Sequence, residues 1–442
     1  MPWESIEFLR GEFARRLVDL EQPGASEEEQ REQARSLIRV TVAGWLQARS
    51  RTEAALTAVQ EAAVEQAVFD AHYRAGPLQR YLDMPGAEEI YVDGTQAVLV
   101  DFKDRRERFP GLVATEQQLR ELINRLATAS GHGERRLTET APVAHFRLPD
   151  RSRVAATLAP LSSRTSMVIR VHGALTAGLP DLRGWGAISG AMHAFLMSAV
   201  RARKSIVVAG AMRAGKTTML RALAREVPNH ETMVTLETDR ELYLDEDQFN
   251  PDLAAGTAHV IALEERRSNG EDAGEITVRD LIPDSLRMGA TRVIVGEVRD
   301  QVASEMLKAT SAGGVGSMTT LHATSPDVVF PRLEQLCMEA GMSAEAARGL
   351  VATSLDLVVY IEQELNPRRR WVSHIWEVTP GESGPAVQPV FQPDPESGDP
   401  RGVPGHVPRC MPELAKVGLH SEWLTRPEYG LWDKPFDEGE QR

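Results

Sequence analysis

The segment "SIVVAGAMRAGKTTMLRAL" constrains the fold of this chain more than any other stretch. An apolar run that begins at Ser205 is followed by a turn from Gly210 to Gly215 and then by a helical pattern. Together with Lys216 and Thr217, these glycines match G-x-x-x-x-G-K-[ST], in the strand–turn–helix context that this motif requires. Main-chain N–H groups of such a turn surround a phosphate group. The sequence therefore predicts a nucleotide site, and the alternative is a glycine turn that arose by chance.

The residue types in and after this turn suit a triphosphate with Mg²⁺. Lys216 places positive charge at the β and γ oxygens, the Thr217 hydroxyl is a Mg²⁺ ligand, and Thr218 reaches the α-phosphate. The residues between the two glycines are Ala211, Met212, Arg213 and Ala214. Because main-chain groups form the cradle, these side chains are tolerated, at a cost of about 1–2 kcal/mol if Arg213 or Ala214 takes a positive φ. We expect ATP and Mg²⁺ to bind through residues 210–218.

The region around the motif alternates between strand and helix patterns from about residue 187 to residue 378. Its apolar runs are "SIVVAG", "TMVTLE", "HVIAL" and "RVIVGEV", and helical patterns surround "KTTMLRALAREV" and "TVRDLIPDSLRM". Strands that are apolar on both faces are typical of a parallel sheet covered by helices on both sides. A further strand is predicted at "RRRWVSHIWEV". This region therefore predicts an α/β domain.

The rest of the chain has a different character. Residues 1–83 have apolar positions at helical spacing and predict a bundle of two or three helices, which is either a structural extension or a partner-docking element. Residues 85–172 combine a hairpin, an amphipathic helix and three short strands, and they predict an α+β domain. Residues 173–186 predict a linker rich in Gly and Pro. Residues 379–442 predict a Pro/Gly-rich acidic tail with a short helix at "PELAKVGLHSEWL".

The composition of the chain argues against several other functional assignments. The chain has 50 Lys and Arg against 64 Asp and Glu, a formal charge of −14. No global basic field therefore attracts nucleic acid, so we expect no direct nucleic-acid binding, and a DNA-translocating motor is disfavoured. Cys337 and Cys410 have neither metal-ligand spacing nor a disulfide framework, which fits a reducing compartment. The early acidic residues argue against a signal peptide, and no apolar run reaches about 18 residues, so we expect no transmembrane segment.

Three further motifs come after the phosphate-binding turn in order. They are "TLETDREL", "TRVIVGEVRD" and "GGVGSMTTLHA", and "RLPDRSRV" precedes the turn. This set resembles the type II/type IV secretion ATPase superfamily, most nearly its tight-adherence (Tad) pilus branch, over residues 85–380. The resemblance implies a RecA-like P-loop ATPase domain behind an N-terminal α+β domain, and a homo-hexameric ring. It also implies a cytoplasmic protein held at the inner face of the membrane by inner-membrane platform proteins of a pilus or secretion system.

The resemblance also assigns roles to individual residues. Glu297 falls on the acid that holds Mg²⁺ through water or orients the attacking water, and Glu237 falls on an acid that polarises this water. His322 falls on a γ-phosphate sensor, although it also suits an ordinary loop histidine. Arg147 and Arg153 fall on N-terminal-domain arginines that stabilise phosphate charge, although both also suit surface ion pairs. Phosphoryl transfer needs such a set, because negative charge spreads over the γ oxygens and a carboxylate must align the water.

Departures from the family pattern leave two functions open. Thr238 stands where the family has a second acid, and Gly314 and Val315 replace the histidine and acid that open its histidine motif. Arg287 and Arg299 are further candidates for arginines that stabilise the charge of the phosphates. The first function is an ATP-hydrolysing ring motor that powers pilus assembly or protein secretion across the bacterial envelope. The second is a nucleotide-binding structural subunit of the same machinery, with weak or no hydrolysis.

Overall fold

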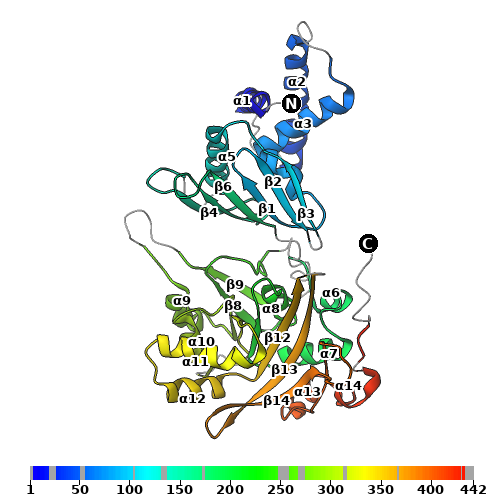
Figure 1. The fold of residues 1–442 in the computed structure, drawn as a ribbon, viewed down its shortest axis with the longest axis vertical. Coiled ribbons are helices and arrows are strands. Elements are labelled where there is room, and N and C mark those ends of the chain that lie inside the picture. Colours follow the sequence, from blue (N-terminus) through cyan, green and yellow to red (C-terminus); the bar gives the residue numbers. More distant parts are fainter. Residues whose placement is uncertain are drawn as a thin grey trace. The chain divides into compact units, whose positions relative to one another are not determined.

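The chain forms two compact units, Met1–Gly173 and Ala174–Arg442, each with its own sheet and its own hydrophobic core (Figure 1). The computed structural model describes residues 3–18, 26–49, 55–102, 105–130, 137–171, 175–246, 258–266, 274–311, 316–365, 368–429 and 431–433 of the 442-residue chain. The first unit is α+β and the second is α/β, which confirms the fold class expected from the sequence.

A helical bundle forms the beginning of the first unit. Its described helices are α1 (Trp3–Val18), α2 (Glu27–Arg49) and α3 (Ala58–Tyr73), and they precede η1 (Gly76–Leu78) and α4 (Gln79–Leu82). Each of the three long helices packs on the other two. Their shared core consists of apolar side chains at helical spacing, among them Ile6, Leu9, Phe13, Ile38, Val42, Val64 and Val68. The apolar periodicity of the sequence therefore corresponds to real buried faces.

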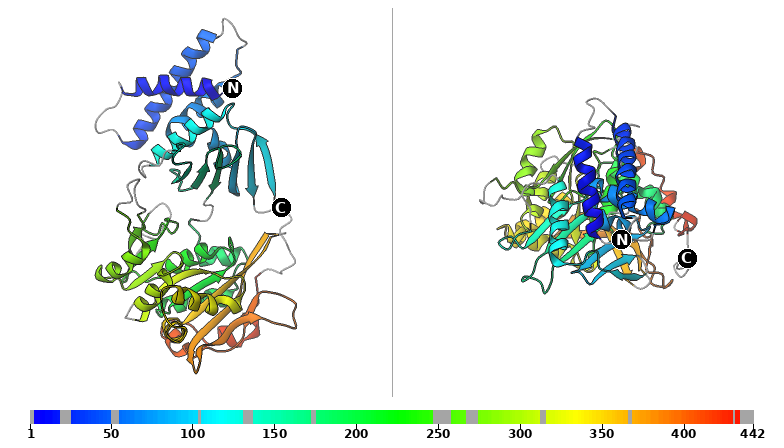
Figure 2. Two further views of the ribbon diagram at one scale, coloured as in Figure 1. Left: turned by 60° about the vertical axis from the view of Figure 1, so that its left-hand side comes forward. Right: turned by 90° about the horizontal axis from the view of Figure 1, so that it is seen from above.

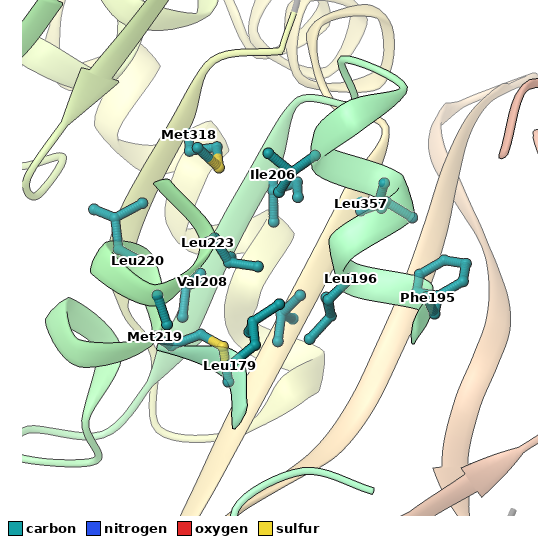
Figure 3. Packing of buried hydrophobic residues seen from close by; sticks show 14 of the residues in the cluster. Leu179, Phe195, Leu196, Ile206, Val208, Met219, Leu220, Leu223, Met318 and Leu357 are labelled. Atoms are coloured by element: carbon teal, nitrogen blue, oxygen red, sulfur yellow. The ribbon is translucent and has the colours of Figure 1, made fainter. Parts of the chain in front are cut away.

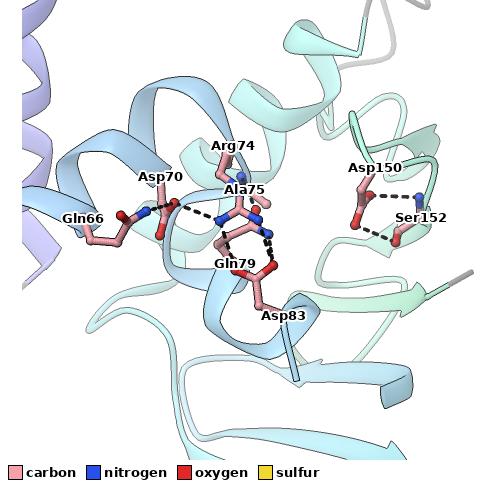
Figure 4. A network of polar contacts seen from close by, with 8 residues as sticks. All are labelled: Gln66, Asp70, Arg74, Ala75, Gln79, Asp83, Asp150 and Ser152. Atoms are coloured by element: carbon pink, nitrogen blue, oxygen red, sulfur yellow. Dashed lines mark hydrogen bonds and ion pairs between the residues drawn. The ribbon is translucent and has the colours of Figure 1, made fainter. Parts of the chain in front are cut away.

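A polar network ties the end of α3 to the segment that leads into the first sheet (Figure 4). The guanidinium of Arg74 pairs with Asp70 at 3.3 Å and with Asp83 at 2.8 Å. The side chain of Gln79 donates to Asp83 at 2.9 Å and accepts the N–H of Ala75 at 3.1 Å. One arginine thus joins residues on both sides of the turn, and it anchors the last helix of the bundle to α4.

The first unit contains an antiparallel sheet in the strand order β3-β2-β1-β6-β5-β4. Its described elements are β1 (Ala87–Asp93), β2 (Ala97–Phe102), β3 (Arg106–Pro110), α5 (Glu116–Ala129), β4 (Val143–Arg147), β5 (Arg153–Thr157) and β6 (Ser166–Arg170). The amphipathic helix α5 lies against this sheet (Figure 2). It buries Leu119, Leu122 and Ile123 against Ile90 and Ile169.

The second unit is built on a sheet in the order β15-β14-β13-β12-β7-β11-β10-β8-β9. The described strands are β7 (Ile206–Gly210), β8 (Thr232–Glu237), β9 (His259–Glu264), β10 (Arg292–Val295), β11 (Met318–His322), β12 (Leu357–Leu365), β13 (Arg368–Gly381), β14 (Gly384–Pro393) and β15 (Gly402–Pro404). From β12 to β9 all neighbouring strands are parallel. The strands β7, β8, β9 and β10 lie at the runs "SIVVAG", "TMVTLE", "HVIAL" and "RVIVGEV", as the apolar character of these runs predicts, and β10 ends at Val295.

Helices cover both faces of this sheet. They are α6 (Leu179–Gly184), α7 (Gly190–Arg201), α8 (Lys216–Ala224), α9 (Val278–Arg287), α10 (Val302–Ser311), η3 (Pro326–Val328), α11 (Val329–Glu339), α12 (Ala344–Ser354), α13 (Met411–Lys416), α14 (Glu422–Thr425) and η4 (Pro427–Tyr429). None of the described helices combines the length and the apolarity that crossing a membrane requires.

Successive residues of β7 point into two separate cores, as the alternation of a strand requires. Ile206 and Val208 pack with α7 and α8, and Figure 3 shows them in one cluster with Leu196 and Leu223. Val207 and Ala209 point to the opposite face and pack with α9 to α12. Because β7 is buried on both sides, the turn that comes after it is held on a rigid support.

The expected linker over residues 173–186 is wrong for its described part. Residues 179–184 form α6, which packs on α7 and α8. Leu179 is fully buried, and Leu182 is buried in the same core. The Gly and Pro content of this stretch suggested a linker, although it contains two core positions of a short helix. The residues of this helix belong to the second unit.

The expected boundary between residues 378 and 379 is also wrong, because it falls inside β13. The sheet continues through β14 and β15, and Val390 and Phe391 are fully buried. The Pro-rich composition suggested a loose tail. In β14, however, the prolines are accommodated within the paired strand: Pro385 stands opposite Pro380 of β13, Pro389 stands opposite Trp376, and Pro393 stands opposite Gly402 of β15.

The segment after β15 is held by buried polar contacts. Glu377 of β13, which is 4% exposed, accepts the N–H groups of Arg409 at 2.7 Å and Cys410 at 2.8 Å. Lys204 pairs with Glu413 of α13. The end of the described chain is therefore part of the second core, and we call these contacts the Glu377 clasp.

Candidate nucleotide site

The sequence motifs converge at the carboxyl ends of neighbouring parallel strands. Gly210 ends β7, His322 ends β11, Glu297 comes after β10 and Glu237 ends β8, and these strands are adjacent in the order β7-β11-β10-β8. In open α/β sheets, ligands bind at this edge. The sheet topology therefore brings together residues that are more than a hundred positions apart in the sequence.

The turn after β7 has the shape of a phosphate cradle. A Cβ atom at Gly210 would stand 2.6 Å from the carbonyl oxygen of Ile361 on β12, so only glycine fits there. Gly215 has a φ of +95°, which favours glycine. Arg213 also has a positive φ of +65°, so the turn carries the expected strain of about 1–2 kcal/mol. Met212 is 70% exposed and Arg213 is exposed, and both side chains lie on the outer surface of the turn.

The helix after the turn presents its N-terminus to this cradle. Lys216 begins α8, and Thr217 and Thr218 come next in its first turn, both half-buried. Among the described residues, no side chain caps this helix end. The first N–H groups of a helix lack partners within the helix and carry a partial positive charge, which stabilises an anion. This end of α8 therefore suits a phosphate group.

Lys216 begins a chain of polar contacts across three strand ends. Its Nζ donates to the carbonyl oxygens of Gly210 at 3.1 Å and Ala211 at 2.8 Å, and it lies 3.0 Å from Nδ1 of His322. Nε2 of His322 lies 3.1 Å from Oε1 of Glu297. Since an ammonium group only donates, Nδ1 accepts and the Nε2–H group donates to the carboxylate. One imidazole thus links the lysine to the acid.

The environment of Glu297 keeps its carboxyl group ionised. Burial alone would raise its pKa, but hydrogen bonds from His322 and Arg299 outweigh this effect and lower the pKa to about 2. Nη2 of Arg299 lies 2.6 Å from Oε2 of Glu297. A carboxylate with so low a pKa is a weak base, but it is a strong ligand for cations and for the hydrogens of a water molecule.

Glu237 has the opposite environment. It is 3% exposed, and burial raises its pKa to about 8, although N–H groups of the loop after β8 partly counter this effect. Its Oε1 accepts the N–H groups of Glu241 at 2.9 Å and Leu242 at 3.1 Å. Its Cγ lies 3.0 Å from the place where a Cβ of Gly296 would stand. Glu237 is therefore next to Glu297 along the sheet edge, and it holds its own loop in place.

Sequence reasoning missed Arg221, a residue that holds the same loop. This arginine of α8 is 4% exposed, and its guanidinium donates to the carbonyl oxygens of Leu242, at 3.0 Å, and of Glu241. In the sequence, Arg221 is one more charged position of a helical pattern. Only its burial in the structure distinguishes it from an arginine that faces solvent. The helix that begins at Lys216 thus also supports the loop after Glu237.

Arg147 and Arg153 belong to the first unit, where they stand opposite each other on β4 and β5. Arg153 also stands opposite Arg170 of β6, so three arginines form a row across the sheet. The connecting turn is held by Asp150, whose two oxygens accept the N–H and the hydroxyl of Ser152, each at 3.0 Å (Figure 4). Guanidinium groups bind phosphate with paired hydrogen bonds, so the chemistry of the row suits a phosphate group.

The remaining candidates are dispersed. Thr238 is exposed directly after β8, and Arg287 is the last residue of α9, where it pairs with Asp284 at 2.9 Å. Gly314 and Val315 lie outside the described residues. The structure therefore groups Lys216, His322 and Glu297 through direct contacts, with Glu237 beside them.

Comparison with known proteins gives consistent matches. The family model described as "Type II/IV secretion system protein" matches residues 72–375. A Mycobacterium tuberculosis (strain H37Rv) protein whose name refers to conjugal transfer is 32% identical over 303 residues, which are 67% of this chain and 82% of that protein. The type IV secretion system protein PtlH of Bordetella pertussis is 36% identical over 192 residues, which are 42% of this chain and 54% of PtlH.

Among solved structures, the ATPase DotB of Legionella pneumophila aligns with 72% of this chain and 81% of its own, at 18% identity and a TM-score of 0.47. The sequence matches confirm the superfamily that the motifs resemble, and they do not single out its tight-adherence branch. Because the family model spans more than half of the residues, the chain belongs to the type II/IV secretion system protein family.

Proposed function

We propose that this protein is an ATP-hydrolysing motor that powers pilus assembly of the tight-adherence type or protein secretion across a bacterial envelope. The observation that carries this proposal is the contact chain from Lys216 through His322 to Glu297, at the ends of three neighbouring strands. Transfer of a phosphoryl group to water requires a cation at the phosphates and an ionised acid near the attacking water. This chain of contacts supplies both at one edge of the sheet.

The side chains at this edge fit ATP with Mg²⁺. Gly210 leaves no room for a Cβ, and the N-terminus of α8 faces the same turn. Lys216 would hold the phosphates, while Thr217 and Glu297 would hold the ion. When bound, Mg²⁺ neutralises charge on the phosphate oxygens. Glu297, which stays ionised at neutral pH, then orients the attacking water.

In this proposal, His322 reports the state of the phosphates. The ammonium group of Lys216 donates to two main-chain carbonyls and to the imidazole of His322. A γ-phosphate is a stronger acceptor for that ammonium than a carbonyl oxygen. Its arrival therefore shifts Lys216, and His322 carries this shift to Glu297. Arg147 and Arg153 of the first unit add charge stabilisation in this proposal.

Two substitutions test the proposal on the purified full-length protein. Lys216→Ala is expected to abolish ATP binding measured by calorimetry. Glu297→Gln is expected to leave ATP binding close to wild type and to reduce phosphate release by about 10²–10³-fold, because a transition-state interaction is lost. Wild-type turnover in Glu297→Gln would remove this residue from the chemistry, and undiminished ATP affinity in Lys216→Ala would overturn the whole site.

A second function, a nucleotide-binding structural subunit with weak or no hydrolysis, is favoured by the position of Glu237. Its Oε1 accepts hydrogen bonds from its own loop, and Thr238 replaces the family's second acid. Phosphate release separates the two functions. Tight ATP binding by an assembled oligomer without phosphate release would support the structural subunit and exclude the motor.

We further propose that the protein works as a homo-hexamer in the cytoplasm, docked on inner-membrane platform proteins and without direct nucleic-acid contact. The names of its relatives, which refer to type IV secretion and conjugal transfer, support a place in an envelope machine. Light scattering in the presence of ATP tests the hexamer, and a smaller particle under all nucleotide conditions would contradict it. Salt-sensitive binding to DNA would contradict the absence of nucleic-acid contact.

A further inference from the structure

The hairpin of β12 and β13 extends past the end of β7 and lies beside the phosphate-binding turn. β12 runs parallel to β7, with Ile361 opposite Gly210, and it continues to Leu365. β13 returns from Arg368, so that Arg370 stands directly opposite Gln363. These residues are therefore level with the turn and not with the body of the sheet.

Gln363 and Arg370 share the face of the hairpin that points to the turn, because directly opposite residues of antiparallel strands lie on the same face. Nε2 of Gln363 donates to the carbonyl oxygen of Met212 at 2.7 Å. Cδ of Arg370 lies 3.6 Å from the place where a Cβ of Gly215 would stand. The aliphatic stem of Arg370 thus runs against the glycine that precedes Lys216.

The neighbouring arginine points the other way. Arg369 alternates with Arg370 along β13, and it stands opposite Glu364, with Nε of Arg369 3.7 Å from Oε2 of Glu364. One strand thus offers two adjacent arginines, one toward the turn and one away from it. This pair provides a matched internal comparison.

Positive charge is therefore concentrated around the turn from two separate elements. Lys216 contributes an ammonium group from α8, and Arg370 contributes a guanidinium from β13 at the preceding glycine. Two cations and a helix N-terminus beside one turn make the local electrostatic potential more positive, and this favours the binding of an anion. A guanidinium matches phosphate with two parallel hydrogen bonds, and the strand holds the stem of Arg370 before any ligand arrives.

We propose that Arg370 binds the phosphate chain of the nucleotide in this site, an inference that rests on the proposed function. The main-chain groups of the turn surround the α- and β-phosphates. Arg370 lies at this part of the site, at the glycine before the lysine, and so contacts phosphates that ADP and ATP share. Its contribution is to nucleotide affinity, and the hydrolysis step itself depends on other residues.

The test measures ADP binding by the full-length protein with calorimetry in the presence of Mg²⁺. Arg370→Gln is expected to weaken ADP binding about tenfold, the loss typical of one charge-assisted contact. Arg369→Gln is the matched control and is expected to stay within about twofold of wild type, since Arg369 lies on the opposite face of the strand and pairs with Glu364. Arg370→Met, which keeps a stem against Gly215 and removes the charge, gives the same result as Arg370→Gln and replaces it if that variant does not fold.

Inorganic pyrophosphate, used as a competitor of ADP, shows which part of the nucleotide is bound. Arg370→Gln is expected to weaken competition by pyrophosphate about as much as binding of ADP. A loss for ADP without a loss for pyrophosphate would overturn the phosphate contact, and so would equal losses in Arg370→Gln and Arg369→Gln. If the wild-type protein binds no ADP, the nucleotide site itself is overturned. If it binds ADP and Arg370→Gln binds equally well, only the role of Arg370 fails.

Discussion

At the scale of single residues, two glutamates at the ends of neighbouring strands have opposite properties. Hydrogen bonds from His322 and Arg299 lower the pKa of Glu297 to about 2 against the effect of its burial, whereas burial raises the pKa of Glu237 to about 8. The two side chains are chemically identical, so the difference between their pKa values comes from their surroundings alone. Motifs in the sequence identified both acids, but they carry no information on which one is buried beside loop N–H groups and which one meets an imidazole and a guanidinium.

The raised pKa of Glu237 predicts a specific dependence of stability on pH. A group whose folded pKa exceeds its unfolded value of 4.5 contributes stability that is full below that value and is lost as pH rises through about 8. Glu237→Gln is neutral at every pH. Its thermal midpoint, measured by circular dichroism, is expected to match wild type at pH 5 and to exceed it by about 5 °C at pH 9. A constant offset at both pH values would contradict a buried proton on Glu237.

At the scale of elements, α8 has two functions that the sequence showed only in part. Its N-terminus faces the turn after β7, as the motif predicts. Further along, Arg221 fixes the loop after β8, and periodicity alone cannot distinguish this buried arginine from a solvated one. The strands and the parallel sheet could be predicted because apolar runs bounded by turns have few other interpretations. The position of α6 and the strands β14 and β15 could not, because Pro and Gly content outweighed a few buried positions.

Because Arg221 supports the loop after β8, its substitution is expected to affect phosphate release and nucleotide affinity to different extents. Arg221→Met fills similar space but leaves the carbonyl oxygens of Glu241 and Leu242 without their donor, at a cost of about 1–3 kcal/mol. We expect the loop beside Glu237 to lose its position and phosphate release to fall several-fold, while ADP affinity stays near wild type. Calorimetry and a phosphate-release assay measure the two quantities. An equal loss of affinity would place the effect in the cradle instead of the loop.

The turn between β4 and β5 predicts a second effect at this scale. Asp150→Ala removes both hydrogen bonds from Ser152, so the thermal midpoint is expected to fall by an amount equivalent to about 1 kcal/mol. Arg151→Gly is the comparison in the same turn. Arg151 has a φ of 71°, so glycine relieves strain there, and this gain is expected to offset the lost side-chain contacts and leave stability unchanged. Equal destabilisation by both variants would show that the turn depends on residue size and not on the Asp150 contacts.

At the scale of the whole molecule, the candidate residues are divided between two units. The turn after β7, His322 and Glu297 lie in Ala174–Arg442, while Arg147 and Arg153 lie in Met1–Gly173. Each unit buries its own apolar core, so neither needs the other for its burial. The sequence predicted a division of roles between an N-terminal domain and an ATPase domain. The roles of the arginines in the first unit stay predictions, since they depend on the arrangement of the two units during hydrolysis.

This division predicts how a fragment behaves. Residues 174–442 expressed alone are expected to unfold cooperatively and to bind ADP as the full-length protein does, because the turn and its supports are all within the fragment. Phosphate release is expected to fall on the order of a hundredfold, since Arg147 and Arg153, which we propose stabilise phosphate charge, are missing. Circular dichroism, calorimetry and a phosphate-release assay measure these properties. Full turnover by the fragment would show that Arg147 and Arg153 take no part.

The Glu377 clasp has a consequence for shortened forms of this protein. A stop codon just after Gly381 would delete Phe391 and Leu414 from the interior. It would also leave the two carboxylate oxygens of Glu377 without the N–H groups of Arg409 and Cys410. It would also uncover the long strand β13 as an open edge, which other copies can extend by pairing. Such a polypeptide is expected to accumulate as aggregates and not as a shortened, folded protein. The proline-rich stretch, which its composition suggested was dispensable, thus protects the edge of β13 from aggregation.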